Sequence, residues 1–368
     1  DKFKSAEAVL TASRTAWAAS AGTVVAAEKK RRQQAPPTPF NTTALQAAAA
    51  SEGISPARTM RIAESLYMDG LVSYPRVDNT VYPASLDLKG ILSTLAEVPE
   101  YSAHAKKILG GALTPTRGKL ETTDHPPIHP TGAGDPHKLK PEEWKLYNLI
   151  SRRFMATLMG PATIEGTKVT IEVAGEKFIA RGDVLVDPGF RAAYHYGLKK
   201  DEVLPALDEG ASVDFLGATS EEKQTQPPSR FSQGTLIQEM EKRGLGTKAT
   251  RHAIIERLYE VGYAQNDPAE PTSLGRAVID ALTSFAPRIT TPEMTAELDA
   301  EMDDIANGRK SREGVVEHSR ELLARVMEQL IPAAAEVGEA LKEASADDAK
   351  VGLCPKSGHD LLMKHSKT

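Results

Sequence analysis

The sequence predicts a multidomain protein of mixed α and β structure, with mostly helical domains and one small β-rich part. The chain has 368 residues, which is enough for two or three domains with separate cores. Residues 163–216 contain short runs of strand character separated by Gly and Pro. Residues 42–71, 139–159 and 235–344 instead carry apolar side chains at helical spacing.

The first 50 residues predict a strand followed by a helix. Residues 22–28 are rich in Val and Ala and precede the basic run at residues 29–32, which indicates a strand that ends in a charged edge. Three prolines within residues 36–39 then break the backbone. Thr42 or Thr43 can cap the helix that follows.

Further along the chain, helices flank the β-rich part on both sides. Ser55 followed by proline begins a second helix, in which Ile62, Leu66 and Leu71 form an apolar stripe that leads to Tyr74. The helix predicted at 139–159 carries its own stripe: Leu146, Leu149, Ile150, Phe154 and Leu158. The predicted strands of the β-rich part are residues 168–173, 178–181, 184–186 and 212–216.

Composition restricts the class of protein without indicating its partner. Hydrophobic residues make up 40% and charged residues 26%, and the net charge is -5, so any contact with a polyanion must come from local arrangement. A single cysteine, Cys354, excludes an intramolecular disulfide framework. No apolar run approaches the ~20 residues that span a bilayer. These observations predict a cytoplasmic protein that is not embedded in a membrane.

Residues 70–79 read Gly-Leu-Val-Ser-Tyr-Pro-Arg-Val-Asp-Asn and present a tyrosine beside an arginine. Pro75 favours an extended backbone for the preceding residue, and side chains two apart in an extended chain project to the same side. Tyr74 and Arg76 are therefore expected to face one site. There a guanidinium can stabilise a phenolate and hold a phosphate oxygen through paired donors. The pair suits attack on a phosphodiester, although the same residue types also occur in surface turns.

This decapeptide resembles the active-site motif of type IA DNA topoisomerases, Gly-Leu-Ile-Ser/Thr-Tyr-x-Arg-Thr-Asp-Ser/Asn, with Val77 in place of the usual threonine. Further segments match the family in the same order along the chain. They are residues 36–46 (Pro-x-Pro-Phe-x-Thr-Ser/Thr-x-Leu-Gln), 124–131 (Ala/Asp-His-x-x-Ile-x-Pro-Thr), 225–232 (Thr-x-Pro-Pro-x-Arg-Tyr/Phe-Ser/Thr) and 244–255 (Gly-Ile-Gly-x-x-x-Thr). The sequence of residues 124–131 resembles archaeal members of the family more than bacterial ones.

The resemblance implies a padlock-like fold in which a split β-rich arch carries an inserted, swinging domain. The implied domains are 1–35, the first part of the arch; 36–160, the inserted domain with the tyrosine; 161–222, the second part of the arch; 223–345, a helical DNA-binding domain; and 346–368, a remnant of a zinc-ribbon-like tail. The first residue is Asp1 rather than Met, and no buried strand followed by the family's acidic cluster precedes Tyr74. The sequence is therefore expected to be a fragment that lacks the family's N-terminal Toprim domain.

The resemblance also implies an activity: cleavage and religation of single-stranded DNA with strand passage, without ATP, by a monomer. Tyr74 forms a 5′-phosphotyrosyl intermediate, Arg76 holds the scissile phosphate and His125 contacts or orients it. Seven residues are expected to bind DNA: Gln46, His129, Arg230, Thr247, Lys248, Thr250 and Arg251. The alternative is a catalytically inert clamp for single-stranded DNA. A tyrosine recombinase is disfavoured because its His-x-x-Arg cluster is absent from the sequence.

Metal ions are not expected on this chain. The family binds Mg²⁺ at Toprim, and the isolated chain is expected to be inactive without that domain. Glu293, Glu297 and Glu301 lie four residues apart, a pattern that predicts a solvated helix face rather than a metal site. Near the C-terminus, Ser357 stands where a zinc ribbon has its second cysteine after Cys354, so no zinc is predicted.

Overall fold

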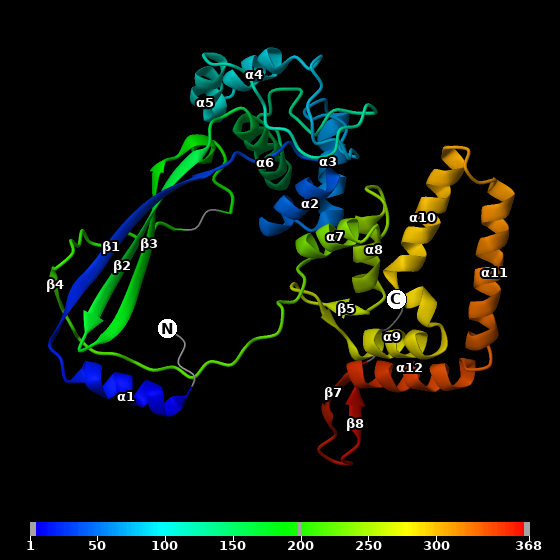
Figure 1. The fold of residues 1–368 in the computed structure, drawn as a ribbon. Coiled ribbons are helices and arrows are strands. Elements are labelled where there is room, and N and C mark those ends of the chain that lie inside the picture. The colour runs from blue at the N-terminus through cyan, green and yellow to red at the C-terminus, as the bar shows by residue number, and fades with distance from the viewer. Residues whose placement is uncertain (1–4, 198–199, 364–368) are drawn as a thin grey trace. The chain divides into compact units, whose positions relative to one another are not determined.

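The computed structural model describes residues 5–197 and 200–363, which form two compact units. Unit 1 comprises Asp1–Pro39 and Thr80–Pro228, and unit 2 comprises Phe40–Asn79 and Ser229–Thr368. The mixed α and β architecture predicted from the sequence is confirmed (Figure 1). These units group the chain by contact and are not the predicted domains, whose boundaries stay a prediction.

Unit 1 combines a four-stranded antiparallel sheet with helices. The strand order is β3-β2-β1-β4, so β1 from the start of the chain lies between strands that come more than a hundred residues later (Figure 1). The elements are α1 (Ala6–Trp17), β1 (Ala21–Gln34), α4 (Leu88–Ala96), α5 (Pro99–Leu109), α6 (Pro141–Thr157), β2 (Ala162–Val173), β3 (Glu176–Asp187), the 3-10 helix η1 (Gly189–Ala192) and β4 (Ser212–Asp214).

Strand β1 is longer than predicted, because the basic run continues it instead of ending it. Its charged residues find acidic partners on the neighbouring strands, since Arg31 Nε lies 2.9 Å from a Glu165 carboxylate oxygen. Arg32 donates two hydrogen bonds, of 2.7 and 2.8 Å, to the carboxylate of Asp183 on β3. The separately predicted strands at 178–181 and 184–186 are likewise one strand, because Gly182 and Asp183 stay paired with β2.

The helical part of unit 1 has a dense aromatic core. The predicted stripe of α6 is buried throughout, which confirms it, and Phe154 is fully enclosed. Tyr101 of α5 and Tyr147 of α6 are also fully buried, with ring centroids 6.3 Å apart. Burying side chains of this size contributes about 1.5–3 kcal/mol each, which fixes the helices against one another.

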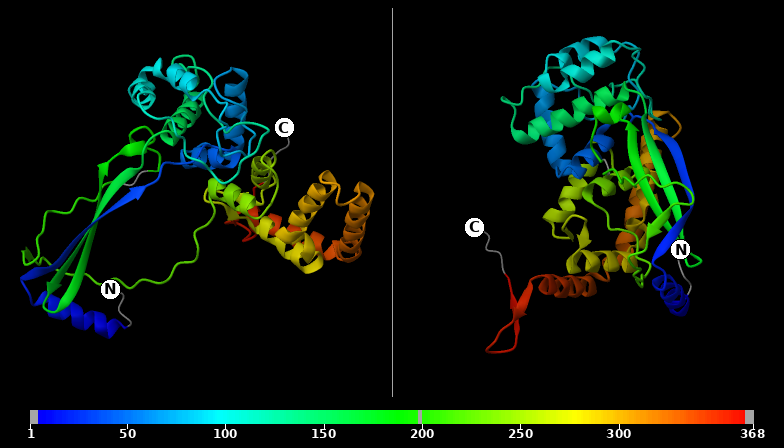
Figure 2. Two further views of the ribbon diagram at one scale, coloured as in Figure 1. Left: turned by 45° about the horizontal axis from the view of Figure 1, so that its top comes forward. Right: turned by 90° about the vertical axis from the view of Figure 1, so that its left-hand side faces the viewer.

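Unit 2 is helical apart from two short hairpins. Its elements are α2 (Thr42–Ser51), α3 (Pro56–Met68), α7 (Gln233–Lys242), α8 (Arg251–Glu260), β5 (Ala264–Gln265), β6 (Glu270–Pro271), α9 (Ser273–Phe285), the 3-10 helix η2 (Pro287–Thr290), α10 (Pro292–Ala306), α11 (Arg312–Leu330), α12 (Ala334–Asp348), β7 (Lys350–Leu353) and β8 (Asp360–Leu362). Helix α2 packs on α7 and α3, and α3 packs on α8. The β7–β8 hairpin, which includes Cys354, follows α12 (Figure 2).

Side-chain caps define where the helices of unit 2 begin. The cap of α2 is Asn41, whose side chain accepts a hydrogen bond from Ala44 N, rather than the predicted Thr42 or Thr43. Asn is among the best N-cap residues, and a cap stabilises a helix by about 1 kcal/mol. Ser55 caps α3 with proline in the first turn, as predicted. Ile62 and Leu66 of its stripe are buried, and Leu71 is half-buried.

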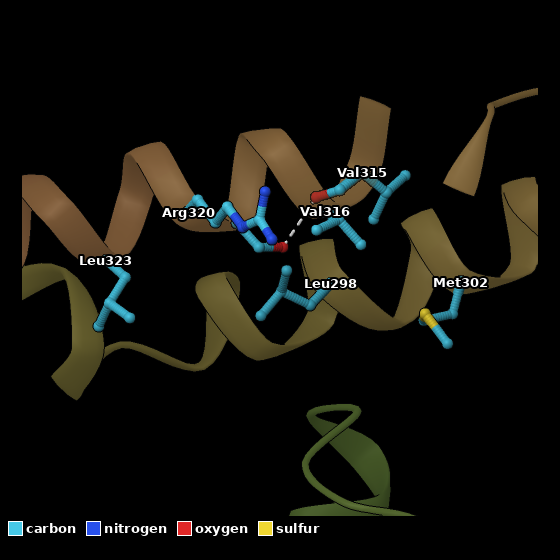
Figure 3. A pocket seen from close by; sticks show the side chains of 7 residues that line it. Leu298, Met302, Val315, Val316, Arg320 and Leu323 are labelled. Carbon is cyan, nitrogen blue, oxygen red and sulfur yellow. Dashed lines mark hydrogen bonds between the residues drawn. The ribbon is translucent and has the colours of Figure 1, made fainter. Parts of the chain in front are cut away.

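Helices α10 and α11 lie side by side and enclose a shallow apolar groove. Leu298 and Met302 of α10 face Val315, Val316 and Leu323 of α11 across it (Figure 3). The groove is the packing seam of this helix pair, and none of the predicted site residues lines it.

One prediction about α10 is wrong. Glu293 and Glu297 are exposed as expected, but Glu301 is buried and not solvated. Its Oε1 accepts hydrogen bonds of 3.1 Å from Lys310 Nζ and 3.0 Å from His318 Nδ1. The glutamate spacing alone could not indicate this, because both partners come from beyond the end of the helix.

Candidate active site

The segment that carries Tyr74 follows α3 directly and is set by how that helix ends. Gly70 adopts a φ of 71°, which glycine reaches without strain, and Leu71 N bonds to Leu66 O to close the helix. Beyond it, Pro75 and Val77 are buried while Tyr74 and Arg76 are half-buried. This alternation is the pattern of an extended segment with one face on the core and the other open.

Thr42, at the first position of α2, fastens this segment. Its hydroxyl lies 2.8 Å from Pro75 O and 2.9 Å from Val77 O, and it accepts a hydrogen bond of 2.8 Å from Val77 N. Thr42 N also donates to Val77 O at 2.9 Å. Because Asn41 caps the helix, the threonine hydroxyl is free for these bonds, which hold the backbone on both sides of Arg76.

Arg76 is oriented by an acidic partner from α3. Its Nε and Nη2 lie 2.9 and 2.5 Å from the same oxygen, Oε1 of Glu64. Within the described residues, these bonds use two of the five guanidinium hydrogens, so three can serve another acceptor. The Tyr74 ring packs edge-on against Tyr67, with ring centroids 5.5 Å apart. The structure therefore places a phenol and an oriented guanidinium on one short segment.

The loop that precedes α8 supplies a second charged contact. Lys248 Nζ lies 2.9 Å from Oδ2 of Asp78, two residues after Arg76. Thr247 and Thr250 are exposed, and Thr247 N bonds to Thr250 Oγ1 at 2.9 Å. Gly246 has a φ of 65°, which brings the chain sharply into the helix. Lys248 is thereby held next to the tyrosine segment, while its DNA contact stays a prediction.

Three other predicted DNA contacts of unit 2 lie in different settings. Arg251 is 9% exposed and bonds to Leu245 O, Thr43 and Glu241, which ties α8 to α2 and α7. Gln46 is also buried, and its Nε2 has no hydrogen-bond partner among the described residues. Arg230 is exposed, 3.8 Å from Glu270. The DNA contacts of these three residues stay predictions.

The two predicted histidines belong to unit 1. His125 is exposed at a bend. His129 is buried, its Nδ1 lies 2.7 Å from Pro127 O, and its ring packs edge-on against Tyr82. Burial lowers the pKa of His129, and the bond to Pro127 offsets this only in part. The predicted roles of His125 and His129 toward the DNA stay predictions.

Sequence reasoning did not single out Glu64, Asp78 or His252 for this site. His252 lies on α8, and burial lowers its pKa, with the charge of Arg76 the next cause. Its Nδ1 is buried and has no hydrogen-bond partner within the described residues. A signal was present for Asp78, which is part of the decapeptide. His252 falls within the matching segment 244–255, but its place at this site depends on the packing of α8 against α3.

Within residues 5–197 and 200–363, no three His, Cys, Asp or Glu side chains converge in a way that could hold a metal ion. No helix in the same ranges is both long and apolar enough to cross a membrane.

Comparison with known proteins places these features in a family. A family model described as DNA topoisomerase matches residues 1–317. The chain is 42% identical over 331 residues to DNA topoisomerase 1 of Archaeoglobus fulgidus, covering 90% of this chain and 49% of that protein. It is 40% identical to DNA topoisomerase 1 of Thermoplasma acidophilum, covering 86% of this chain and 41% of the relative. This chain therefore spans about half the length of the relatives it matches.

A solved structure agrees with the sequence comparison. Full-length topoisomerase I from Thermotoga maritima superposes with a TM-score of 0.69 at 26% identity, covering 89% of this chain and 55% of that one. The aligned part includes most of both compact units, so the similarity extends well beyond the tyrosine motif. The chain belongs to the type IA DNA topoisomerase family.

Proposed function

We propose that this chain is the strand-cleaving body of a type IA DNA topoisomerase, with Tyr74 as its nucleophile. The observation that supports this most directly is the fastening of the Tyr74–Arg76 segment by the Thr42 hydroxyl, together with the contact of Arg76 with Glu64. Holding the nucleophile and the phosphate-binding arginine on one short segment lowers the entropic part of the activation free energy.

The proposed reaction is a transesterification on single-stranded DNA. Tyr74 Oη bonds to phosphorus as the bond from phosphorus to the 3′ oxygen breaks. The phenolic proton is lost, and the departing 3′ oxygen gains a proton. Arg76 donates hydrogen bonds to the non-bridging oxygens, where negative charge increases in the transition state. Reversal after strand passage restores the phosphodiester without ATP, because the bond energy is kept in the phosphotyrosyl link.

The remaining predicted residues complete the proposal. His125 contacts or orients the scissile phosphate, and Gln46, His129, Arg230, Thr247, Lys248, Thr250 and Arg251 contact the DNA strand. Mg²⁺ is assigned to a Toprim domain, and the described residues of this chain offer no cluster that fits the ion. No step is assigned to the metal, and zinc is not part of the proposal.

The test is formation of a covalent adduct on a labelled single-stranded oligonucleotide. The chain is incubated alone and with a separately purified Toprim domain and Mg²⁺, and the mixture is then denatured. We expect an adduct only with Toprim present, its loss in Tyr74→Phe, and oligonucleotide binding within about twofold of the wild type in that variant.

Tyr67→Phe is the matched control, because it removes a hydroxyl from the ring that packs on Tyr74. Equal loss of the adduct in both variants would remove Tyr74 from its role. Tight binding of the oligonucleotide without an adduct in any mixture favours an inert single-strand clamp.

A further inference from the structure

Charged side chains of α3 and α8 face one another next to the Tyr74 segment. Arg61 and Glu64 are three residues apart on α3, and His252 and Glu256 are four apart on α8, so each pair occupies one helix face. Arg61 Nη1 lies 3.0 Å from Glu256 Oε1. Glu64 holds Arg76 by two hydrogen bonds. All five groups belong to unit 2.

With a neutral imidazole this cluster has no net charge. The two arginines contribute two positive charges, and Glu64 and Glu256 contribute two negative ones. Arg76 and Arg61 disfavour a proton on His252, whereas Glu64 and Glu256 favour one, and burial is the largest influence and lowers the pKa. The His252 side chain is half-buried, and its buried Nδ1 has no hydrogen-bond partner in the described part of the chain. A proton on that nitrogen is therefore unfavourable, and the neutral tautomer carries it on Nε2.

We propose that Glu64 and His252 are positioning residues for Arg76. Glu64 fixes the orientation of the Arg76 guanidinium, and neutral His252 does not compete with Arg76 for the Glu64 carboxylate. The inference rests on the proposed function and adds two residues that act through Arg76. Glu64 takes Nε–H and one Nη2–H, which directs the remaining three N–H groups to a phosphate. Protonated His252 adds a third cation that competes for Glu64 and repels Arg76.

The first experiment measures this coupling without any DNA. The pKa of His252 is followed by NMR in the full chain with labelled histidine. We expect it below the ordinary histidine pKa of about 6.5. We expect Arg76→Gln to raise it by about half a pH unit or more, because a nearby positive charge is removed. Glu64→Gln should lower it.

Arg243→Gln is the matched control for the coupling. It also breaks an arginine–glutamate pair in unit 2, a 2.7 Å contact with Glu239 on α7, and its charge is not among the influences on His252. Unchanged pKa values of His252 in both Arg76→Gln and Glu64→Gln would overturn the positioning role, whatever the chain does to DNA.

The second experiment measures adduct formation with Toprim and Mg²⁺ supplied. Glu64→Gln should lower the adduct rate about tenfold, with oligonucleotide binding within about twofold, because misplacement of a catalytic group affects the chemical step more than binding. His252→Gln should keep the adduct at neutral pH and lose the wild-type decline in acid. His252→Lys, which is permanently charged, should behave at neutral pH as the wild type does in acid.

The outcomes separate the two proposals. Equal adduct rates and pH profiles in His252→Gln and His252→Lys, with folding verified by circular dichroism, overturn the role of His252. Absence of any wild-type adduct, together with the expected pKa coupling, overturns the strand-cleaving function and supports the positioning of Arg76.

Discussion

Replacing Thr42 by valine should loosen the tyrosine segment without changing the shape of the buried side chain. Thr42 is 1% exposed, and its hydroxyl is the acceptor for Val77 N and lies within bonding distance of Pro75 O. Valine leaves both buried backbone groups without this partner, at a cost of about 1–3 kcal/mol for each such group. Val77 O keeps its bond from Thr42 N, so these two groups together give an expected loss of about 2–6 kcal/mol.

Hydrogen exchange of peptides covering residues 70–79 measures this loss locally. A reduction of about 2–6 kcal/mol in the opening free energy accelerates exchange of the Val77 amide at least about thirtyfold. With Toprim and Mg²⁺ supplied, the adduct rate should fall about a hundredfold, because a shift of about 1 Å in catalytic groups has effects of that size.

Two controls isolate the hydroxyl. Thr42→Ser keeps the oxygen and should retain most of the protection. Thr59→Val removes a fully buried hydroxyl that donates to Ser55 O. Ser55 O still accepts the hydrogen bond of 2.8 Å from Thr59 N, so exchange in residues 70–79 should not change. Equal protection of Val77 in the wild type and in Thr42→Val would refute the fastening role.

Three further predictions concern stability. Because the pKa of His129 is lowered in the folded chain, the unfolded chain binds more protons below pH ~6.5. This group should therefore lower the free energy of unfolding on acidification by up to about 1.4 kcal/mol per pH unit. In His129→Gln the thermal midpoint should change less between pH 5 and 7 than in the wild type. Leu45→Ala, at a fully buried position of α2, should lower the free energy of unfolding in urea by about 2–5 kcal/mol. Arg32→Gln should leave the thermal midpoint nearly unchanged, because its ion pair with Asp183 is half-exposed and solvent weakens it.

Local periodicity was sufficient to predict α3 and α6 and most of their buried stripes. Ile62 and Leu66 of α3 and Phe154 of α6 are buried as expected. Apolar residues that recur every three to four positions form one face of a helix, and that face packs against the core. The end of β1 was not predictable in the same way. Its basic residues continue the strand because acidic partners on β2 and β3 neutralise them, and those strands come far later in the sequence.

The candidate site divides along the same line. Tyr74 and Arg76 could be proposed from ten consecutive residues, because proline and extended geometry act locally. Asp78 lies in the same ten residues, but its contact with Lys248 depends on where the loop before α8 packs. Glu64 and His252 lie on α3 and α8, and only the packing of these elements brings them to the site. The cap of α2 shows the limit most clearly. Thr42 and Asn41 are both good cap residues, and only the tertiary structure shows that Thr42 serves the tyrosine segment instead.

The charges around the tyrosine segment suggest how a chain with a net charge of -5 could bind a polyanion selectively. The predicted DNA ligands Arg76, Lys248 and Arg251 each contact a carboxylate, those of Glu64, Asp78 and Glu241 respectively. A DNA phosphate must therefore compete with a carboxylate for each of these cations. The net attraction of the cations for a strand that is wrongly placed is then small. Only a backbone that reaches several of these cations together offsets the weakened ion pairs. Under the proposed function, geometry rather than total charge then determines which strand is held at Tyr74.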